Sequence, residues 1–233
     1  MFDERARRAR YLAECYPAAR EILVFYSGLA DWQNQVPPSD LEGLRPFLPS
    51  LLDLIARTAP AKLADAARSL GPADFDRLVA AYSSADSVDS SASVLPLQFF
   101  TRALLQPYAA RLPAGLDCPW CPGPPQAGCL RPQGDGLAFE IICALCLRGR
   151  PFPRTRCPGC DEASEHKVVQ FTSADFPHLR LQACESCKRY LQVVDISRDP
   201  AALPDVDELA GLPLDLWAQQ QGYRKLRPNL AGI

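Results

Sequence analysis

Four Cys-x-x-Cys pairs lie within one stretch of seventy residues and constrain the fold more than any other feature of this chain. The pairs are Cys118/Cys121, Cys143/Cys146, Cys157/Cys160 and Cys184/Cys187. In each pair a short turn directs both sulfurs at one point, and neighbouring backbone N–H groups help to neutralise the thiolate charge. Two such pairs joined by a hairpin are the usual way to build a tetrahedral thiolate metal site. One pair alone is weak evidence, whereas four predict metal binding.

The spacing of the pairs predicts how they share metal ions. Cys121 and Cys143 are separated by 21 residues, and Cys160 and Cys184 by 23. Because these intervals are similar, we expect sequential sites, with the first two pairs around one ion and the last two around another. In the cross-braced alternative, the first pair joins the third and the second joins the fourth, which requires the hairpins to interleave.

Four thiolates close a metal site, whereas a catalytic zinc keeps an open position. We therefore expect two structural ions, each contributing about 10 kcal/mol or more of folding free energy to a ribbon with little core. The ligand set suits zinc or a single iron, so the expected cofactors are two metal ions in four-cysteine sites, iron or zinc. Iron–sulfur clusters use the same ligands, but the short turns in CPWCPG and CPGC are more typical of mononuclear sites.

Metal binding, and not disulfide formation, is expected because the chain has the character of a cytoplasmic protein. Its 48% apolar and 22% charged residues are ordinary for a globular protein. Arg7-Arg8 is not followed by an apolar export segment or a cleavage site. The apolar run at 21–30 is too short to span a membrane. Thiols stay reduced in the cytoplasm, where paired cysteines indicate metal.

The first part of the chain predicts helices. Apolar residues recur at helical spacing in the ranges 3–15, 17–35, 48–55, 61–70, 72–82 and 95–112. The polar, low-complexity stretch at 83–93 predicts a loop, and Pro113-Ala114-Gly115 ends the helical part. Within the cysteine region, hairpins are expected from 127–131 with 137–142 and from 167–172 with 179–182. A further strand is expected at 190–196 and a short helix at 209–220.

The predicted fold class is α+β, with a helical N-terminal domain, two tandem rubredoxin-like or zinc-ribbon four-cysteine units and a short C-terminal helix. The expected boundaries are 1–115 for the all-α domain, 116–152 for the first ribbon, 153–198 for the second, and 199–233 for the C-terminal helix and tail. No nucleophile with an adjacent base, glycine-rich phosphate loop or catalytic carboxylate pair is found, so we expect a protein that is not an enzyme.

The remaining candidates are single residues and one basic run. A net charge of −2 and a pI near 5.7 argue against a general nucleic-acid binder. A basic run between the two ribbons is either a solvated strand edge or a surface for an acidic peptide or phosphate backbone. We treat its members as candidate partner-binding residues: Arg148, Arg150, Arg154 and Arg156. Cys15 is predicted to be a buried small hydrophobe, and Cys129 to lie outside the complete ligand sets. His166 and His178 are expected on the surface.

These features, taken in order, resemble the formate dehydrogenase accessory protein (FdhE) family. The four cysteine pairs coincide with those of the family in number, order and approximate spacing, and Arg154 lies where the family has an arginine before its third pair. The C-terminal positions that look alike are Ala183, Cys184, Cys187, Tyr190, Leu191, Asp199, Pro200, Asp207, Leu209, Ala210, Leu214, Asp215, Gly222 and Tyr223. The chain departs from the family after the second pair, where Gly149-Arg150 replaces a common Glu-Trp.

The resemblance implies a cytoplasmic maturation factor with rubredoxin-like metal sites. Such a factor binds the catalytic subunit of a formate dehydrogenase before twin-arginine export and supports its assembly without catalysing a known step. Two other functions stay open. The arginine run motivates a nucleic-acid-binding zinc-ribbon protein, and a four-cysteine site with reversibly cycling iron would make a rubredoxin-like electron carrier.

Overall fold

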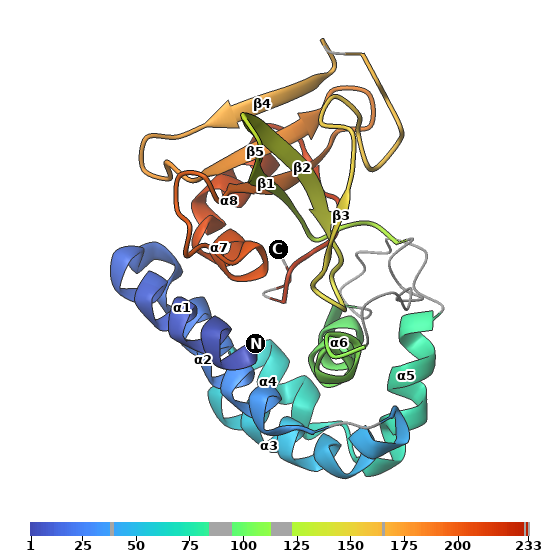
Figure 1. Cartoon of the computed structure of the whole chain (residues 1–233). Coiled ribbons are helices and arrows are strands. Elements are labelled where there is room, and N and C mark those ends of the chain that lie inside the picture. The colour runs from blue at the N-terminus through green and yellow to red at the C-terminus, as the bar shows by residue number, and fades with distance from the viewer. Residues whose placement is uncertain (38–39, 84–94, 113–122, 165, 231, 233) are drawn as a thin grey trace.

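A computed structural model describes the chain except at residues 38–39, 84–94, 113–122, 165, 231 and 233. Helices form the N-terminal part, and a sheet with two further helices forms the C-terminal part (Figure 1). The predicted α+β class with a helical N-terminal region is confirmed. The predicted loop at 83–93 (apart from Ser83), the predicted end of the helical part at 113–115 and the first cysteine pair lie outside the described residues.

The N-terminal helices follow the periodic apolar positions of the sequence. They are α1 (Phe2–Cys15), α2 (Arg20–Gln35), α3 (Leu48–Thr58), α4 (Ala61–Arg68), α5 (Phe75–Ser83) and α6 (Leu95–Ala109). Short 3-10 turns precede α2, α3 and α5 at Pro17–Ala19, Glu42–Phe47 and Pro72–Asp74. α1 ends before Tyr16 (φ −123°, ψ 81°) because the residue before a proline is pushed out of the α region. None of the helices in the described ranges is long and apolar enough to cross a membrane.

The largest apolar cluster lies between these helices and continues into the cysteine region. The helices contribute fully buried side chains that include Leu12, Leu29, Leu51 and Phe100. Cys143, Leu145 and Cys146 belong to the same cluster. The Gln106 side chain on α6 also donates a hydrogen bond to the Ala144 carbonyl at 2.9 Å. The second cysteine pair is therefore held against the helical region by both apolar packing and a buried hydrogen bond.

The described strands form a seven-stranded sheet with the order β3-β2-β1-β6-β5-β4, and β7 pairs with β6. The strands are β1 (Ala127–Gln133), β2 (Gly136–Ile142), β3 (Gly149–Pro151), β4 (Val168–Thr172), β5 (Leu179–Cys184), β6 (Arg189–Asp195) and β7 (Arg224–Lys225). The antiparallel hairpins β1–β2 and β4–β5 are the two that the sequence predicts.

The strands of the two predicted ribbons belong to this one sheet. β1 pairs in parallel with β6, so that Gly128 lies opposite Val193. A Cβ atom at Gly128 would lie 2.8 Å from the Phe139 ring and 3.0 Å from Val193, so the close approach of the strands requires glycine here. The sequence predicted two tandem ribbons and did not include this pairing, which joins strands that are more than sixty residues apart.

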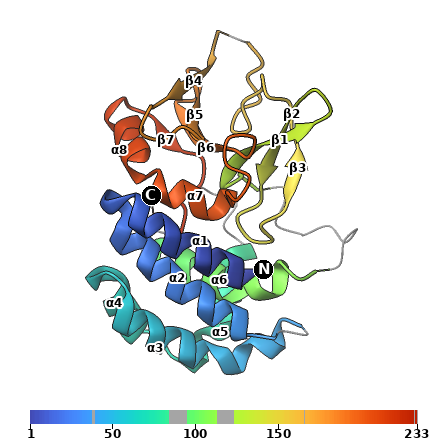
Figure 2. The same ribbon diagram turned by 60° about the vertical axis from the view of Figure 1, so that its left-hand side comes forward.

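The C-terminal helix expected at 209–220 is two helices, α7 (Pro204–Ala210) and α8 (Leu212–Gln220). They meet at Gly211, whose carbonyl and that of Glu208 both accept hydrogen bonds from the Gln192 side chain on β6. A Cβ at Gly211 would lie 2.1 Å from that side chain, which explains the glycine. α7 lies between α1 and the sheet (Figure 2), so it connects the two parts of the molecule.

Candidate metal centre

Four cysteine thiols meet at the end of the sheet that carries β4, β5 and β6. The sulfur of Cys157 lies 3.7 Å from that of Cys187, and the sulfur of Cys160 lies 3.7 Å from that of Cys184. All four sulfurs lie within 4.8 Å of one another. A tetrahedral zinc site with bonds of about 2.3 Å has sulfurs about 3.8 Å apart. The cluster therefore has the size of a site for one ion.

Two turns with the same backbone geometry bring these thiols together. In the loop after β3, the Asp161 N–H donates to the Cys157 carbonyl at 2.9 Å, and Asp161 has a φ of 62°. In the turn between β5 and β6, the Lys188 N–H donates to the Cys184 carbonyl at 2.9 Å, and Lys188 has a φ of 53°. In each turn the left-handed residue directly follows the second cysteine. The chain is thereby reversed with both sulfurs on the same side.

The second cysteine pair has this same turn. The Leu147 N–H donates to the Cys143 carbonyl at 3.1 Å, and Leu147 has a φ of 59°. The cysteines of the first pair lie outside the described residues, so only half of the first predicted ligand set is placed. The shared turn is independent of the sulfur-to-sulfur distances. It indicates that Cys143 and Cys146 are arranged for the same kind of contact as the last two pairs.

The protein surrounds the cluster unevenly. Cys157 and Cys184 are buried, Cys187 is half-buried and Cys160 is exposed. Burial raises the pKa of the Cys157 thiol. Burial also acts to raise the pKa of Cys184, but backbone N–H groups of Cys187 and Ser186 lower it overall. Donors aimed at the sulfurs favour the thiolate form, which is the form that binds a metal.

A second group of potential ligands is satisfied from within the protein. His178, Asp199 and Asp207 lie close enough together to hold a cation. The guanidinium of Arg8, on α1, forms ion pairs with both carboxylates, and the His178 ring lies 3.0 Å from Asp207. The positive charge of Arg8 therefore takes the place that a cation would have. This group links α1 to α7.

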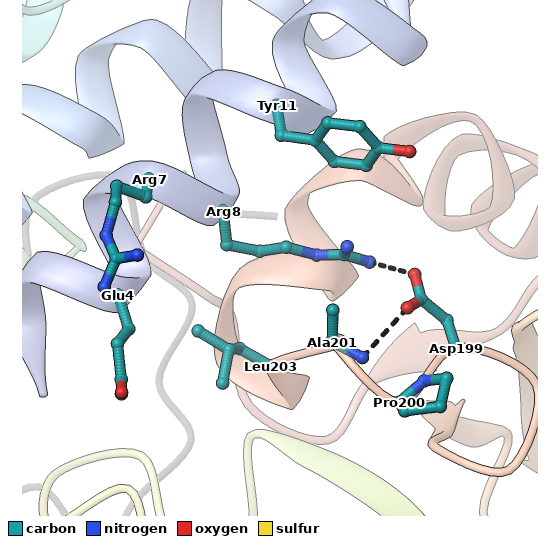
Figure 3. Close-up of a pocket in the computed structure, with 8 residues that line it drawn as sticks. All are labelled: Glu4, Arg7, Arg8, Tyr11, Asp199, Pro200, Ala201 and Leu203. Atoms are coloured by element: carbon teal, nitrogen blue, oxygen red, sulfur yellow. Dashed lines mark hydrogen bonds and ion pairs between the residues drawn. The ribbon is translucent and has the colours of Figure 1, made fainter.

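A cavity of about 590 Å³ opens beside Arg8, between α1 and the segment 199–203 (Figure 3). The Tyr11 ring lies 5.4 Å from the Arg8 guanidinium at this place. The other arginine of the cavity wall, Arg7, pairs with Asp3 at 3.0 Å. The arginines that line the cavity are thus already paired within the chain.

Comparison with known proteins relates the site to one family. The family model described as FdhE, C-terminal domain, matches residues 155–231, a range that contains the whole four-thiol cluster and α7 and α8. The Protein FdhE homolog of Haemophilus influenzae (strain PittEE) is 23% identical over 269 residues, which cover 97% of this chain and 86% of the relative. The chain is thus similar to FdhE proteins, at residues 155–231 through the family model and over its length at lower identity.

Two further FdhE proteins are similar to the chain in sequence or in fold. The Protein FdhE homolog of Aquifex aeolicus (strain VF5) is 30% identical over 116 residues, covering 49% of this chain and 41% of the relative. The chain thus spans about two fifths of the length of such relatives. The crystal structure of the FdhE protein from Pseudomonas aeruginosa covers 99% of this chain and 95% of that chain, with a TM-score of 0.72 and 23% identity. This similarity shows a common fold.

Two predictions for single residues were wrong. Cys15 is exposed, because the solvent-facing side of α1 that carries Tyr11 also carries Cys15 one turn later. His178 is buried, with 5% of its surface exposed, because its ring lies beside the Tyr16 ring at the end of α1 and 3.0 Å from the Asp207 carboxylate. His166 is exposed, as expected. Cys129 is buried in β1, and burial raises its thiol pKa to about 11.

The predicted basic run is divided between two places in the structure. Arg150 lies on the edge strand β3 and is exposed, whereas Arg154 donates a hydrogen bond to Gln170 on β4 at 3.3 Å. Arg156 pairs with Asp161 at 3.4 Å. Arg148 is half-buried, and its carbonyl accepts from the Cys143 N–H. The run is not one continuous patch.

Sequence reasoning missed the buried charges around α7. Asp205 accepts hydrogen bonds from Arg5 on α1, and Glu208 and Asp215 both pair with Lys225. All five side chains are buried. A hydrophobic-periodicity argument treats charged residues as surface residues, so it cannot detect such pairs. The only signal was that acidic residues in α7 fall on every side of a short helix, which leaves no solvent-facing stripe.

Proposed function

We propose that this chain is a metal-binding accessory factor that binds the catalytic subunit of a formate dehydrogenase in the cytoplasm and supports its assembly before export. The observation that carries the proposal is the FdhE C-terminal domain at 155–231, which includes the complete four-thiol cluster. The fold of the whole chain, shared with the FdhE protein from Pseudomonas aeruginosa, supports it.

The eight paired cysteines are the proposed metal ligands. The last four have the spacing that one tetrahedral ion requires, and the second pair has the same turn geometry as the other two described pairs. An ion in the cluster would cross-link the loop after β3 to the turn between β5 and β6. It would thereby stabilise the outer end of the sheet, where the apolar clusters are small.

Two parts of the molecule are available to a client in this proposal. The buried pairs of Arg5 and Arg8 with α7 hold the helical region against the C-terminal part. A buried charge pair is costly to break because it leaves an uncompensated charge. The relative orientation of the two parts is therefore well defined, which suits a factor that holds a partner while that partner is completed. The basic run supplies candidate contacts at Arg148, Arg150, Arg154 and Arg156.

The test is co-purification from cells that produce both this chain, carrying an affinity tag, and a formate dehydrogenase catalytic subunit. We expect the wild type to retain the subunit and to carry two metal ions by elemental analysis. The double variant Cys160→Ser/Cys187→Ser should lose one ion. The matched control is Cys15→Ser, which changes an exposed cysteine outside the cluster. Failure of the wild type to retain the subunit would contradict the proposal.

A rubredoxin-like electron carrier is the second candidate, and one observation favours it. The Cys160 thiol is exposed, so an ion in the cluster would lie close to the protein surface, where electrons can be exchanged. The visible absorption spectrum of the purified protein, oxidised and then reduced, tests this candidate. Reversible bleaching of a thiolate-to-iron band would support it, and a colourless zinc protein would exclude it.

A further inference from the structure

The two edges of the sheet differ in how they are protected. The edge strand β3 is three residues long and contains Arg150 and Pro151, which are features that block pairing with another strand. The opposite edge strand β4 has five residues, VVQFT, with no proline and no charge. Within the described residues nothing pairs with its outer side. In Figure 1, β4 lies on the side of the sheet that faces away from the helical region.

The register of β4 on β5 shows which backbone groups point outward. The Glu185 N–H donates to the Lys167 carbonyl, so the pair 167/185 is hydrogen-bonded. Hydrogen-bonded and non-hydrogen-bonded pairs alternate along an antiparallel ladder. The backbone N–H and C=O groups of Val169 and Phe171 therefore form hydrogen bonds with β5, whereas those of Gln170 and Thr172 point away from it. These are the groups to which an added strand would bond.

One face of this edge is apolar. Val169 and Phe171 pack with Tyr223, and the Phe171 ring meets the Trp217 ring edge-on at 4.9 Å between centroids. Trp217 is 37% exposed, and its neighbour Leu216 is 48% exposed. Large apolar side chains beside an open strand edge are available for contact with the alternate residues of a partner strand.

The other face is basic. Gln170 lies opposite Gln182 and Thr172 lies opposite Arg180, so these side chains share a face. On this face the Arg154 side chain donates a hydrogen bond to the Gln170 side chain. Burial, together with the positive charges of Arg154 and Arg198, lowers the pKa of the Arg180 guanidinium. Asp195 is the carboxylate that pairs with both Arg180 and Arg198. Positive charge is therefore in excess beside the edge.

We infer that the outer edge of β4 binds an extended segment of a protein partner in which apolar residues alternate with acidic ones. The side chains of a strand point alternately to its two faces. The apolar residues of the segment would therefore reach Trp217, and its acidic residues would reach Arg154 and Arg180. When a strand is added to a sheet edge, the backbone hydrogen bonds give affinity, and the alternating side chains of the added strand give specificity. The inference rests on the proposed function only in taking the client enzyme as the source of the segment.

The direct test uses a fluorescein-labelled, end-capped octapeptide of alternating valine and glutamate, with binding followed by fluorescence anisotropy. We expect saturable binding to the wild type and at least tenfold weaker binding of a valine–lysine octapeptide. Gln170→Pro removes an outward N–H that β5 does not use, and we expect about tenfold weaker binding, the effect of one backbone hydrogen bond. Gln170→Ala keeps that N–H and is the matched control. No saturable binding, or equal binding by Gln170→Pro, overturns the inference.

Charge is tested at one residue beside the edge and one far from it. Arg154→Glu should weaken binding of the glutamate peptide, whereas Lys62→Glu, at an exposed position on α4, should leave it unchanged. Equal effects of both changes would overturn the inference.

Co-purification separates this inference from the proposed function. If the wild type and Gln170→Ala retain the formate dehydrogenase subunit and Gln170→Pro does not, the inference is supported for that client. If Gln170→Pro retains the subunit as well as the wild type does, the inference is overturned and the proposed function stands. If the wild type binds the peptide but not the subunit, the proposed function fails, and the edge of β4 remains a peptide site.

Discussion

The cysteine turn at Cys143–Cys146 and the cluster at the outer end of the sheet share one backbone geometry but have different surroundings. The turn at Cys143 belongs to the large apolar cluster of the helical region, and Leu145 within it is fully buried. The corresponding residue of the last pair, Ser186, is exposed. The same turn is therefore packed into an apolar core in one place and carries an exposed residue in the other, where we expect a bound ion to stabilise it.

The largest expected effect is at the outer cluster. Cys184→Ser should remove one metal ion per chain and lower the stability of this end of the sheet by several kcal/mol, because a structural zinc contributes about 10 kcal/mol or more. Hydrogen exchange should increase in β4 and β5 and stay slow in α2, and elemental analysis measures the ion. Cys15→Ser is the control. An unchanged metal content would show that Cys184 does not hold an ion.

The contact that joins the two regions comes next. Arg8→Ala leaves the buried Asp207 without its ion pair, so we expect the free energy of unfolding to fall by about 3–5 kcal/mol. The neighbouring Arg7→Ala removes an exposed pair with Asp3 and should cost less than about 1 kcal/mol. Urea unfolding measures both. Similar losses in the two variants would contradict the buried pairing of Arg8 with Asp207.

Substituting one position in each turn measures how much packing contributes to that turn. Leu145→Ala should lower the free energy of unfolding by about 2–5 kcal/mol, because it leaves a cavity in the core. Ser186→Ala removes an exposed hydrogen bond to Glu162 and should cost about 1 kcal/mol or less. Thermal unfolding of both variants with metal bound measures the difference. Equal costs would mean that packing does not distinguish the two turns.

The smallest expected effect concerns pH. Burial is the main cause that raises the pKa of Glu208 to about 7. The folded protein then binds more protons than the unfolded chain between pH 4.5 and 7. The stability that arises from this difference in proton binding at Glu208 is fully present below pH 4.5 and is lost as the pH rises to about 7. Its magnitude is up to about 3 kcal/mol. Glu208→Gln should flatten the dependence of the unfolding free energy on pH over this interval, whereas the exposed Glu14→Gln should not. An unchanged slope in Glu208→Gln would exclude this assignment.

Features that depend on neighbours in sequence could be predicted. The cysteine spacing predicted the turns, and alternating apolar residues around Gly134 predicted the β1–β2 hairpin. Pro17 predicted the end of α1. The sequential arrangement predicted that Cys157, Cys160, Cys184 and Cys187 would come together, and their sulfurs do meet. Each of these features depends on hydrogen bonds or chain reversals within a short distance along the chain, so the residue pattern contains the necessary information.

The sequence by itself thus determined the helical N-terminal part, the hairpins and the turns that aim paired thiols at one point. Only the tertiary structure decided that β1 would pair with β6, that His178 would be buried and Cys15 exposed, and that Arg8 would meet Asp207. The physical reason is that a local pattern specifies backbone conformation and an apolar face. Which surface covers that apolar face, and which buried charges pair with each other, depend on which distant parts of the chain pack together.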